Sequence, residues 1–276
     1  MAEVLNQEQL YDKFLQVILS ASQLPYVKIN RKEFLKAEFK DSEHLDVILR
    51  HGPQVVYSSR ALRKRASRLI NNATNKTAIL SLLAGLPSNP VVAVAAGSAD
   101  VIQYFGFALN LSQQIAYLFG EDELFSENNK ELPEEVKIRI VAYLGIMFGA
   151  GGAGFLIQNV FKKGAANVGK KVAQKALMKT AWYPIVKKVG AILGNKVTKA
   201  TVEKVVAKTI PILGGVISSG ITFATFRPMG ERLADTFEKL LNGEIIVDKD
   251  SVNELNQDFD SDSYSDDIID GIYTEK

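Results

Sequence analysis

The spacing of apolar residues near the start of the chain predicts an amphipathic helix. Leu10, Phe14, Val17 and Ile18 recur at the three- and four-residue intervals of one helix face. Pro25 follows this run and is expected to close it, because proline cannot continue a helix.

Two further helices are predicted before residue 70. Asn30 and Glu33 have the spacing of a capping box, and the apolar positions that follow continue as one helix until Gly52 and Pro53. Ser58 or Ser59 can cap a third helix, which carries a cluster of basic residues. The cluster consists of Arg60, Arg63, Lys64, Arg65 and Arg68.

The pattern then becomes almost continuously apolar. Between Lys76 and Glu121, Asp100 is the only charged residue in 44 positions. A Gly-Leu-Pro-Ser-Asn-Pro sequence interrupts this stretch, so we expect a hairpin of two buried helices, the second from about Pro90 to Phe119. An acidic connector, 121–135, follows and ends in a predicted helix start at Pro-Glu-Glu.

Two later runs without charge, 140–161 and 209–226, reach the length of a membrane span. Their small residues allow helix backbones to approach closely. The alternative is a tightly packed crossing or a break, since each glycine in a helix costs about 1 kcal/mol relative to alanine. The candidate packing or insertion residues are Gly145, Gly149, Ala153, Gly214, Gly215 and Gly220.

Alternating patterns typical of strands are scarce, so the sequence predicts an all-α protein with long apolar, glycine-rich helices. Composition suggests three parts. Residues 1–69 form N-terminal amphipathic helices, and 70–243 form an apolar helical domain. Residues 244–276 form an acidic tail that is expected to be disordered, because it has few apolar groups.

The formal net charge of +2 conceals blocks of opposite sign. Segment 160–208 holds twelve lysines and one acid, Glu203, a net of +11, whereas the tail from Glu244 carries eleven acids and two lysines, a net of −9. Lysines beside an apolar stripe suit a lipid surface. The candidate lipid-binding residues are Lys162, Lys163, Lys170, Lys171, Lys175, Lys179, Lys187 and Lys188.

Other partners fit the charge pattern less well. The lysine segment has no arginine and few aromatic residues on which bases could stack, so nucleic acid is not the expected partner. The tail has two interpretations, a solubilising extension, which is favoured, and an intramolecular competitor for the lysine segment. The residues from Met1 to Glu8 include no Lys or Arg, so we expect no secretory signal and a cytoplasmic start.

Candidate chemistry is sparse, and no enzyme activity, metal or cofactor is expected. The absence of cysteine excludes disulfides, thiolate metal sites and a cysteine nucleophile, and no phosphate-binding loop or nucleophile elbow occurs. His44 and His51 are expected at the surface. Asp100 is either a buried structural group, which is favoured, or a functional carboxylate within the membrane.

Residues 70–240 resemble the EcsC protein family. The similarity lies in Ala-Asp100-Val, Leu109–Gly120, Ile210–Gly220 and Phe226–Ala234. The namesake of the family is encoded beside a bacterial ABC transporter, and no reaction is defined for its members. The resemblance implies a bacterial, membrane-linked, non-catalytic protein and supplies no catalytic residues.

These observations lead to one functional hypothesis and two alternatives. The first is a membrane-associated interaction protein that docks peripherally, or partly inserted, on anionic lipid at the cytoplasmic face of the cell membrane. A membrane transport or envelope complex would be a further partner. The alternatives are a pore-forming effector and an integral protein that crosses the membrane within 79–119, 140–161 and 209–226. The sequence specifies no oligomeric state.

Overall fold

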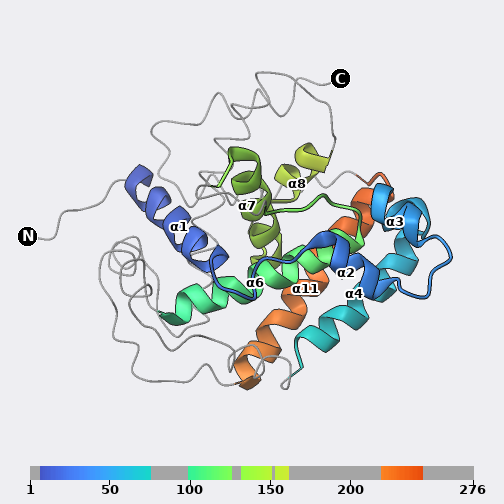
Figure 1. Ribbon diagram of the computed structural model, residues 1–276. Helices are drawn as coiled ribbons and strands as arrows, with labels where there is room; N and C mark the ends of the chain where they lie inside the picture. Colours follow the sequence, from blue (N-terminus) through green and yellow to red (C-terminus); the bar gives the residue numbers. More distant parts are fainter. Residues whose placement is uncertain (1–6, 76–98, 126–131, 151–152, 162–218, 245–276) are drawn as a thin grey trace, which may run out of the picture.

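The computed structural model describes residues 7–75, 99–125, 132–150, 153–161 and 219–244, and each regular element among them is a helix (Figure 1). The all-α prediction is therefore confirmed for this part of the chain. The elements are α1 (Gln7–Ser22), α2 (Arg31–Glu38), α3 (Leu45–His51), the short 3-10 helix η1 (Pro53–Val55), α4 (Ser59–Ala73), α6 (Ala99–Leu118), α7 (Glu134–Phe148), α8 (Ala153–Phe161) and α11 (Ser219–Leu241).

The N-terminal helices begin where their caps predict. The Asn30 side chain accepts a hydrogen bond from the Glu33 amide at 2.9 Å, and α2 starts at the next residue, Arg31. The single helix expected up to Gly52 is instead two helices. The Ser42 amide donates to the Phe39 carbonyl in a turn after α2, a position that a polar Asp-Ser sequence favours.

Ser58 is the residue that caps α4, because its hydroxyl accepts a hydrogen bond from the Ala61 amide at 3.3 Å. The helix buries one apolar side and leaves the opposite side to solvent. Its buried residues are Leu62, Ala66, Leu69 and Ile70. This division fixes which of its basic residues can reach a partner outside the molecule.

Helix α6 lies at the centre of the fold and packs against α1, α2, α4, α7 and α11 (Figure 1). Its near absence of charge follows from these neighbours. Gln113 is the one residue of this helix whose side-chain amide is fully buried. The amide is hydrogen-bonded, because it donates to the Val27 carbonyl at 2.7 Å and accepts from the Ile29 backbone amide. The part of the predicted helix before Ala99 lies outside the described residues.

The apolar run 140–161 does not form the single crossing that its length suggested. Helix α7 starts after Pro133, as predicted, but ends at Phe148, because Gly149 adopts the left-handed conformation, with φ of 69°. Helix α8 then begins at Ala153 and packs against α7. A Cβ atom on Gly145 would lie 2.6 Å from that of Ala153, so the glycine marks a close helix crossing followed by a break.

Helix α11 lies beside α4 and runs antiparallel to it. Gly230 approaches Ile70 near one end of the pair, and Ser59 donates a hydrogen bond to Asn242 at the other, at 2.6 Å. The helix starts inside the expected crossing 209–226 but continues through charged residues to Leu241. No helix in the described ranges has the combination of length and hydropathy that a membrane span requires.

Candidate anion-binding face

Helix α4 carries five basic residues and no acidic residue. The structure divides them into two that have charged partners and three that have none among the described residues. That division identifies the candidate site, because it shows which positive charges are available to an external anion.

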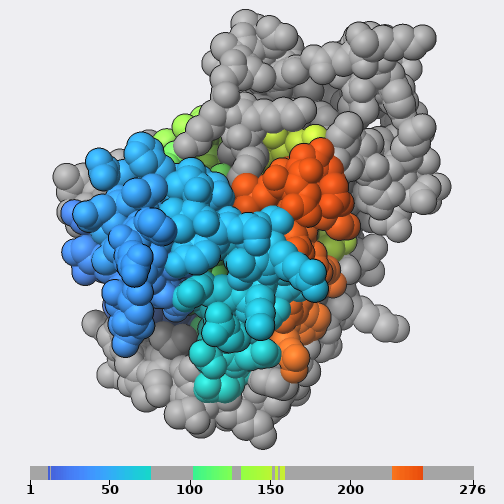
Figure 2. Space-filling model, turned by 90° about the vertical axis from the view of Figure 1, so that its right-hand side faces the viewer, coloured from blue at the N-terminus to red at the C-terminus, as the bar shows by residue number. Residues whose placement is uncertain are grey.

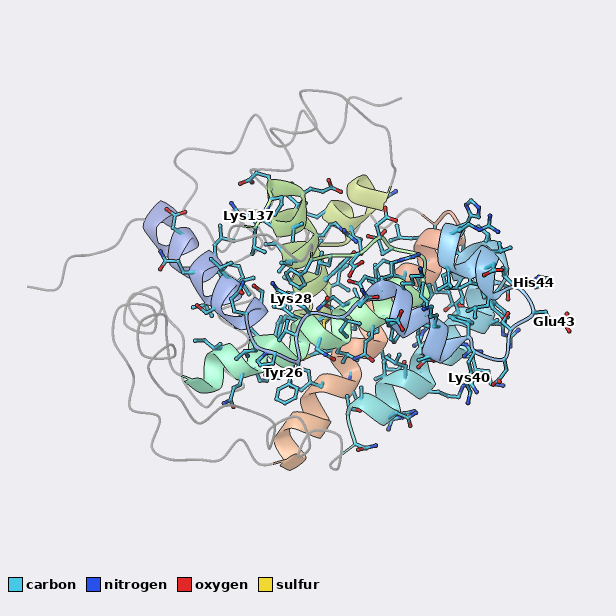
Figure 3. The ribbon with its side chains drawn as sticks, in the orientation of Figure 1. Tyr26, Lys28, Lys40, Glu43, His44 and Lys137 are labelled. Atoms are coloured by element: carbon cyan, nitrogen blue, oxygen red, sulfur yellow. The ribbon has the colours of Figure 1, made fainter. Side chains whose placement is uncertain are left out.

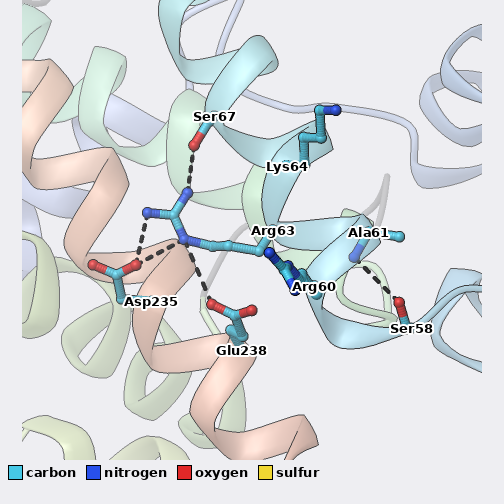
Figure 4. A pocket seen from close by; sticks show the side chains of 8 residues that line it. All are labelled: Ser58, Arg60, Ala61, Arg63, Lys64, Ser67, Asp235 and Glu238. Atoms are coloured by element: carbon cyan, nitrogen blue, oxygen red, sulfur yellow. Dashed lines mark hydrogen bonds and ion pairs between the residues drawn. The ribbon is translucent and has the colours of Figure 1, made fainter.

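Arg63 reaches across to α11 and is neutralised there (Figure 4). Its Nη2 atom lies 2.6 Å from both Glu231 Oε2 and Asp235 Oδ1. Burial lowers the pKa of Arg63, but the hydrogen bonds to Asp235 and Glu231 outweigh it and the pKa is raised. Arg63 therefore joins two helices and is not available to an external ligand.

Arg65 contacts the last residue of α2, Glu38, and the residue after it, Phe39. Its Nη1 atom donates to the Glu38 carbonyl at 2.6 Å and lies 3.7 Å from the Glu38 carboxylate. The guanidinium also stands over the Phe39 ring, 4.4 Å from the ring centroid. This second arginine thus serves the packing of α4 against the N-terminal helices.

The remaining basic residues, Arg60, Lys64 and Arg68, recur every four positions and are all exposed. Within the part of the chain that the structure describes, none of them forms an ion pair. Figure 2 shows α4 in cyan beside α11 in orange on an open side of the molecule. We refer to these three residues as the cationic face.

A shallow hollow of about 720 Å³ lies at the junction of α4 and α11, next to the cationic face (Figure 4). Its lining mixes basic, acidic and hydroxyl groups. The residues are Ser58, Arg60, Ala61, Arg63, Lys64, Ser67, Asp235 and Glu238. Because the acidic groups already pair with Arg63, the site offers an anion an open cationic rim, not an enclosed pocket.

Of the candidate site residues that the sequence singled out, none of those that the structure describes lies at this face. The eight candidate lysines and the pair Gly214 and Gly215 lie outside the described residues. Asp100 is in the first turn of α6 and Gly220 in the first turn of α11. His44 and His51 are exposed, with His44 next to Glu43 at the edge of the molecule (Figure 3). No metal-binding group is found among the residues described.

No local pattern in the sequence indicates the buried ionic network between Glu121, which follows α6, and helix α7. Tyr143 donates to Glu121 Oε2 at 2.6 Å, and Arg139 Nη2 lies 3.1 Å from the same oxygen. Arg139 also donates to the Asp122 carbonyl at 2.6 Å. Burial raises the pKa of the Tyr143 phenol, and the Glu121 carboxylate raises it further. All three side chains are buried, so the network lies inside the fold and is not open to an external ligand.

Comparisons of the chain with known protein families, curated proteins and solved structures find no match. The resemblance to the EcsC family therefore stays a prediction from the sequence. The cationic face and the charge pattern along the chain are the features that bear on function.

Proposed function

We propose that this protein is a membrane-associated helical interaction protein that docks on anionic lipid. Two basic surfaces would make the contact, the cationic face of α4 and the lysine-rich segment 160–208. The observation that supports the proposal best is the division of charge on α4. Arg63 and Arg65 are neutralised, while Arg60, Lys64 and Arg68 are exposed and have no ionic partner in the part of the chain that the structure describes.

Electrostatic attraction is sufficient for measurable docking by such a surface. Each basic residue near an anionic membrane contributes about 1 kcal/mol. Because the apolar side of α4 is buried in the core, this helix would contact headgroups through charge alone. Docking through α4 should therefore weaken as salt screens the interaction.

The proposed location is the cytoplasmic face of a bacterial cell membrane, with a membrane transport or envelope complex as a further partner. The resemblance of residues 70–240 to the EcsC family supports this part of the proposal. The charge pattern supports it as well, since the cytoplasmic leaflet is the anionic one. Apart from Glu244, the acidic tail for which disorder was expected lies outside the described residues. We also propose that the protein has no catalytic activity.

Co-sedimentation with vesicles tests the proposal. The variant with Arg60, Lys64 and Arg68 all changed to Gln should bind mixed phosphatidylglycerol and phosphatidylcholine vesicles about 10- to 100-fold more weakly than the natural chain. Neither protein should bind phosphatidylcholine alone. Changing Lys171, Lys175 and Lys179 to Glu tests the second surface in the same assay.

A matched control is available because other exposed lysines lie outside α4. The variant with Lys28, Lys32 and Lys40 changed to Gln removes the same charge from exposed positions. It should retain most of the binding. Equal losses in the two triple variants would show that only net charge matters, and unchanged binding in both would reject the cationic face.

The pore-forming alternative is not proposed. It rested on the small-residue spacing of Gly145, Gly149 and Ala153, which suggested an interface between membrane helices. In the structure Gly145 and Ala153 pack against each other, and Gly149 ends α7, so these residues already serve the fold.

A further inference from the structure

We infer that the cationic face of α4 is an interaction surface for an acidic segment of the same chain, residues 245–276. The inference stands on the position where α11 ends, on the reach of the chain beyond it and on charge. Its consequence for lipid binding rests on the proposed function, whereas the contact itself does not.

Helix α11 ends next to the start of α4. Ser59, the first residue of α4, donates a hydrogen bond to Asn242 Oδ1 at 2.6 Å. Gly243 has a φ of 74°, and the Glu244 amide donates back to the Lys239 carbonyl at 3.0 Å. These bonds close the last turn of α11 and fix Glu244 beside the amino end of α4.

The acidic residues beyond Glu244 are close enough to reach the cationic face. From Arg60 to Arg68 the helix rises about 12 Å, at about 1.5 Å per residue. An extended chain spans up to about 3.5 Å per residue, so roughly four residues cover this distance. Asp248 and Asp250 follow Glu244 by four and six positions.

Charge complementarity favours this pairing over others in the described structure. The segment from Glu244 to Lys276 carries a net charge of −9, and α4 has no acidic residue of its own. The neighbouring carboxylates of Glu231, Asp235 and Glu238 are already paired with Arg63, and that of Glu38 with Arg65. The three exposed cations are therefore left to a partner from outside the described residues.

Tethering makes weak surface pairs effective. An exposed ion pair between separate molecules is weak, but covalent connection over a few residues holds the acidic groups at an effective concentration in the millimolar range. The acidic segment and an anionic membrane would then compete for the same three cations. Lipid docking through α4 would require displacement of the segment.

Carbodiimide coupling of the full-length protein without lipid tests the contact directly. The reagent joins lysine amines to carboxylates in contact and does not react with arginine, and Lys64 is the only lysine of α4. We expect coupling of Lys64 to acids of 245–276 in monomeric protein at low salt, and its loss at high salt. Exposed Lys28, which precedes α2, is the internal control and should not couple to this segment.

Three results would overturn the inference. In the first, the acidic segment couples only to lysines of 160–208. In the second, coupling is found only in cross-linked dimers. In the third, Lys28 couples to the segment at the same yield as Lys64. Each would assign the acidic segment to another surface or to nonspecific attraction.

A pair of charge variants tests competition with lipid. Changing Asp248, Asp250, Asp258, Asp260 and Asp262 to Asn should tighten binding to phosphatidylglycerol vesicles about 10-fold, whereas changing them to Glu should leave it unchanged. Coupling at Lys64 without any vesicle binding would support the contact and reject the proposed function. Equal vesicle binding by both variants would overturn the competition.

Discussion

Arg60 and Arg63 show how the role of one residue type is set by what lies opposite it. They stand one turn apart on the same helix, yet Arg63 meets two carboxylates of α11 at 2.6 Å while Arg60 faces solvent. The sequence reveals the five basic residues as a single cluster. Only the position of α11 shows that Arg63 pairs within the fold and that Arg60 is available to a partner.

The buried network around Arg139 is expected to be the most sensitive ionic contact in the described structure. Arg139→Met should lower the free energy of unfolding by about 3–5 kcal/mol, because Glu121 would remain buried without its cation. Urea denaturation followed by circular dichroism measures the change.

Lys137 provides the matched control, since it lies on the same helix and pairs with Glu134 near the surface. Lys137→Met should cost about 0.5 kcal/mol or less, as expected for a pair of neighbouring residues on a helix. Similar losses for the two variants would contradict a special role for the buried network.

Local features of single residues were the most predictable from the sequence. The caps at Asn30 and Ser58 depend on residues three positions away, so their chemistry is visible in a short window. The pairing of Glu121 with Arg139 depends on how a connector folds back, and no local pattern encodes it. The candidate site was predictable only as a basic cluster, because the partners that neutralise Arg63 lie more than 160 positions away.

At the level of elements, hydropathy could not decide between one long helix and two short ones over 140–161. Both arrangements bury the same apolar side chains when a protein core is available. The decision rests on backbone conformation, because Gly149 tolerates the left-handed φ that ends α7. The glycines were compatible with a membrane-spanning helix and with a tight crossing or a break, and hydropathy alone did not decide between them.

The close crossing of α7 and α8 should therefore require a glycine at one of the two facing positions, 145 or 153. Gly145→Ala is expected to lower the free energy of unfolding by about 1–3 kcal/mol, since its methyl group would overlap that of Ala153. Combining it with Ala153→Gly moves the methyl group from one helix to the other and should restore most of the stability. Chemical denaturation of the two variants provides the measurement, and no recovery in the double variant would argue against steric overlap.

Across the described part of the molecule, the boundary that composition suggests is not a boundary in packing. Composition changes near residue 70, but one buried cluster contains Phe14 and Leu62 together with Ile115 and Phe237. The N-terminal helices thus complete the core of the apolar segment. The basic surface on α4 consequently belongs to a helix that packs directly against α6 and α11.

Fractionation of the untagged protein tests the proposed mode of membrane attachment. If docking is electrostatic, washing membranes with high salt should release the protein, because the salt screens the lysines and arginines from the headgroups. The triple Gln variant of the cationic face should shift toward the soluble fraction before any wash. Resistance to high salt and to alkaline carbonate would show insertion into the bilayer.

The antiparallel pairing of α4 and α11 also has a consequence for how the chain is made. The bonded residues Ser59 and Asn242 are 183 positions apart. A ribosome that adds about 5–20 residues per second leaves α4 without its partner for roughly ten to forty seconds. During that interval the apolar side that α11 will cover and the basic residues are exposed together on one nascent helix. The contact between α4 and α11 can therefore form only after α6, which also packs against α4, has been made.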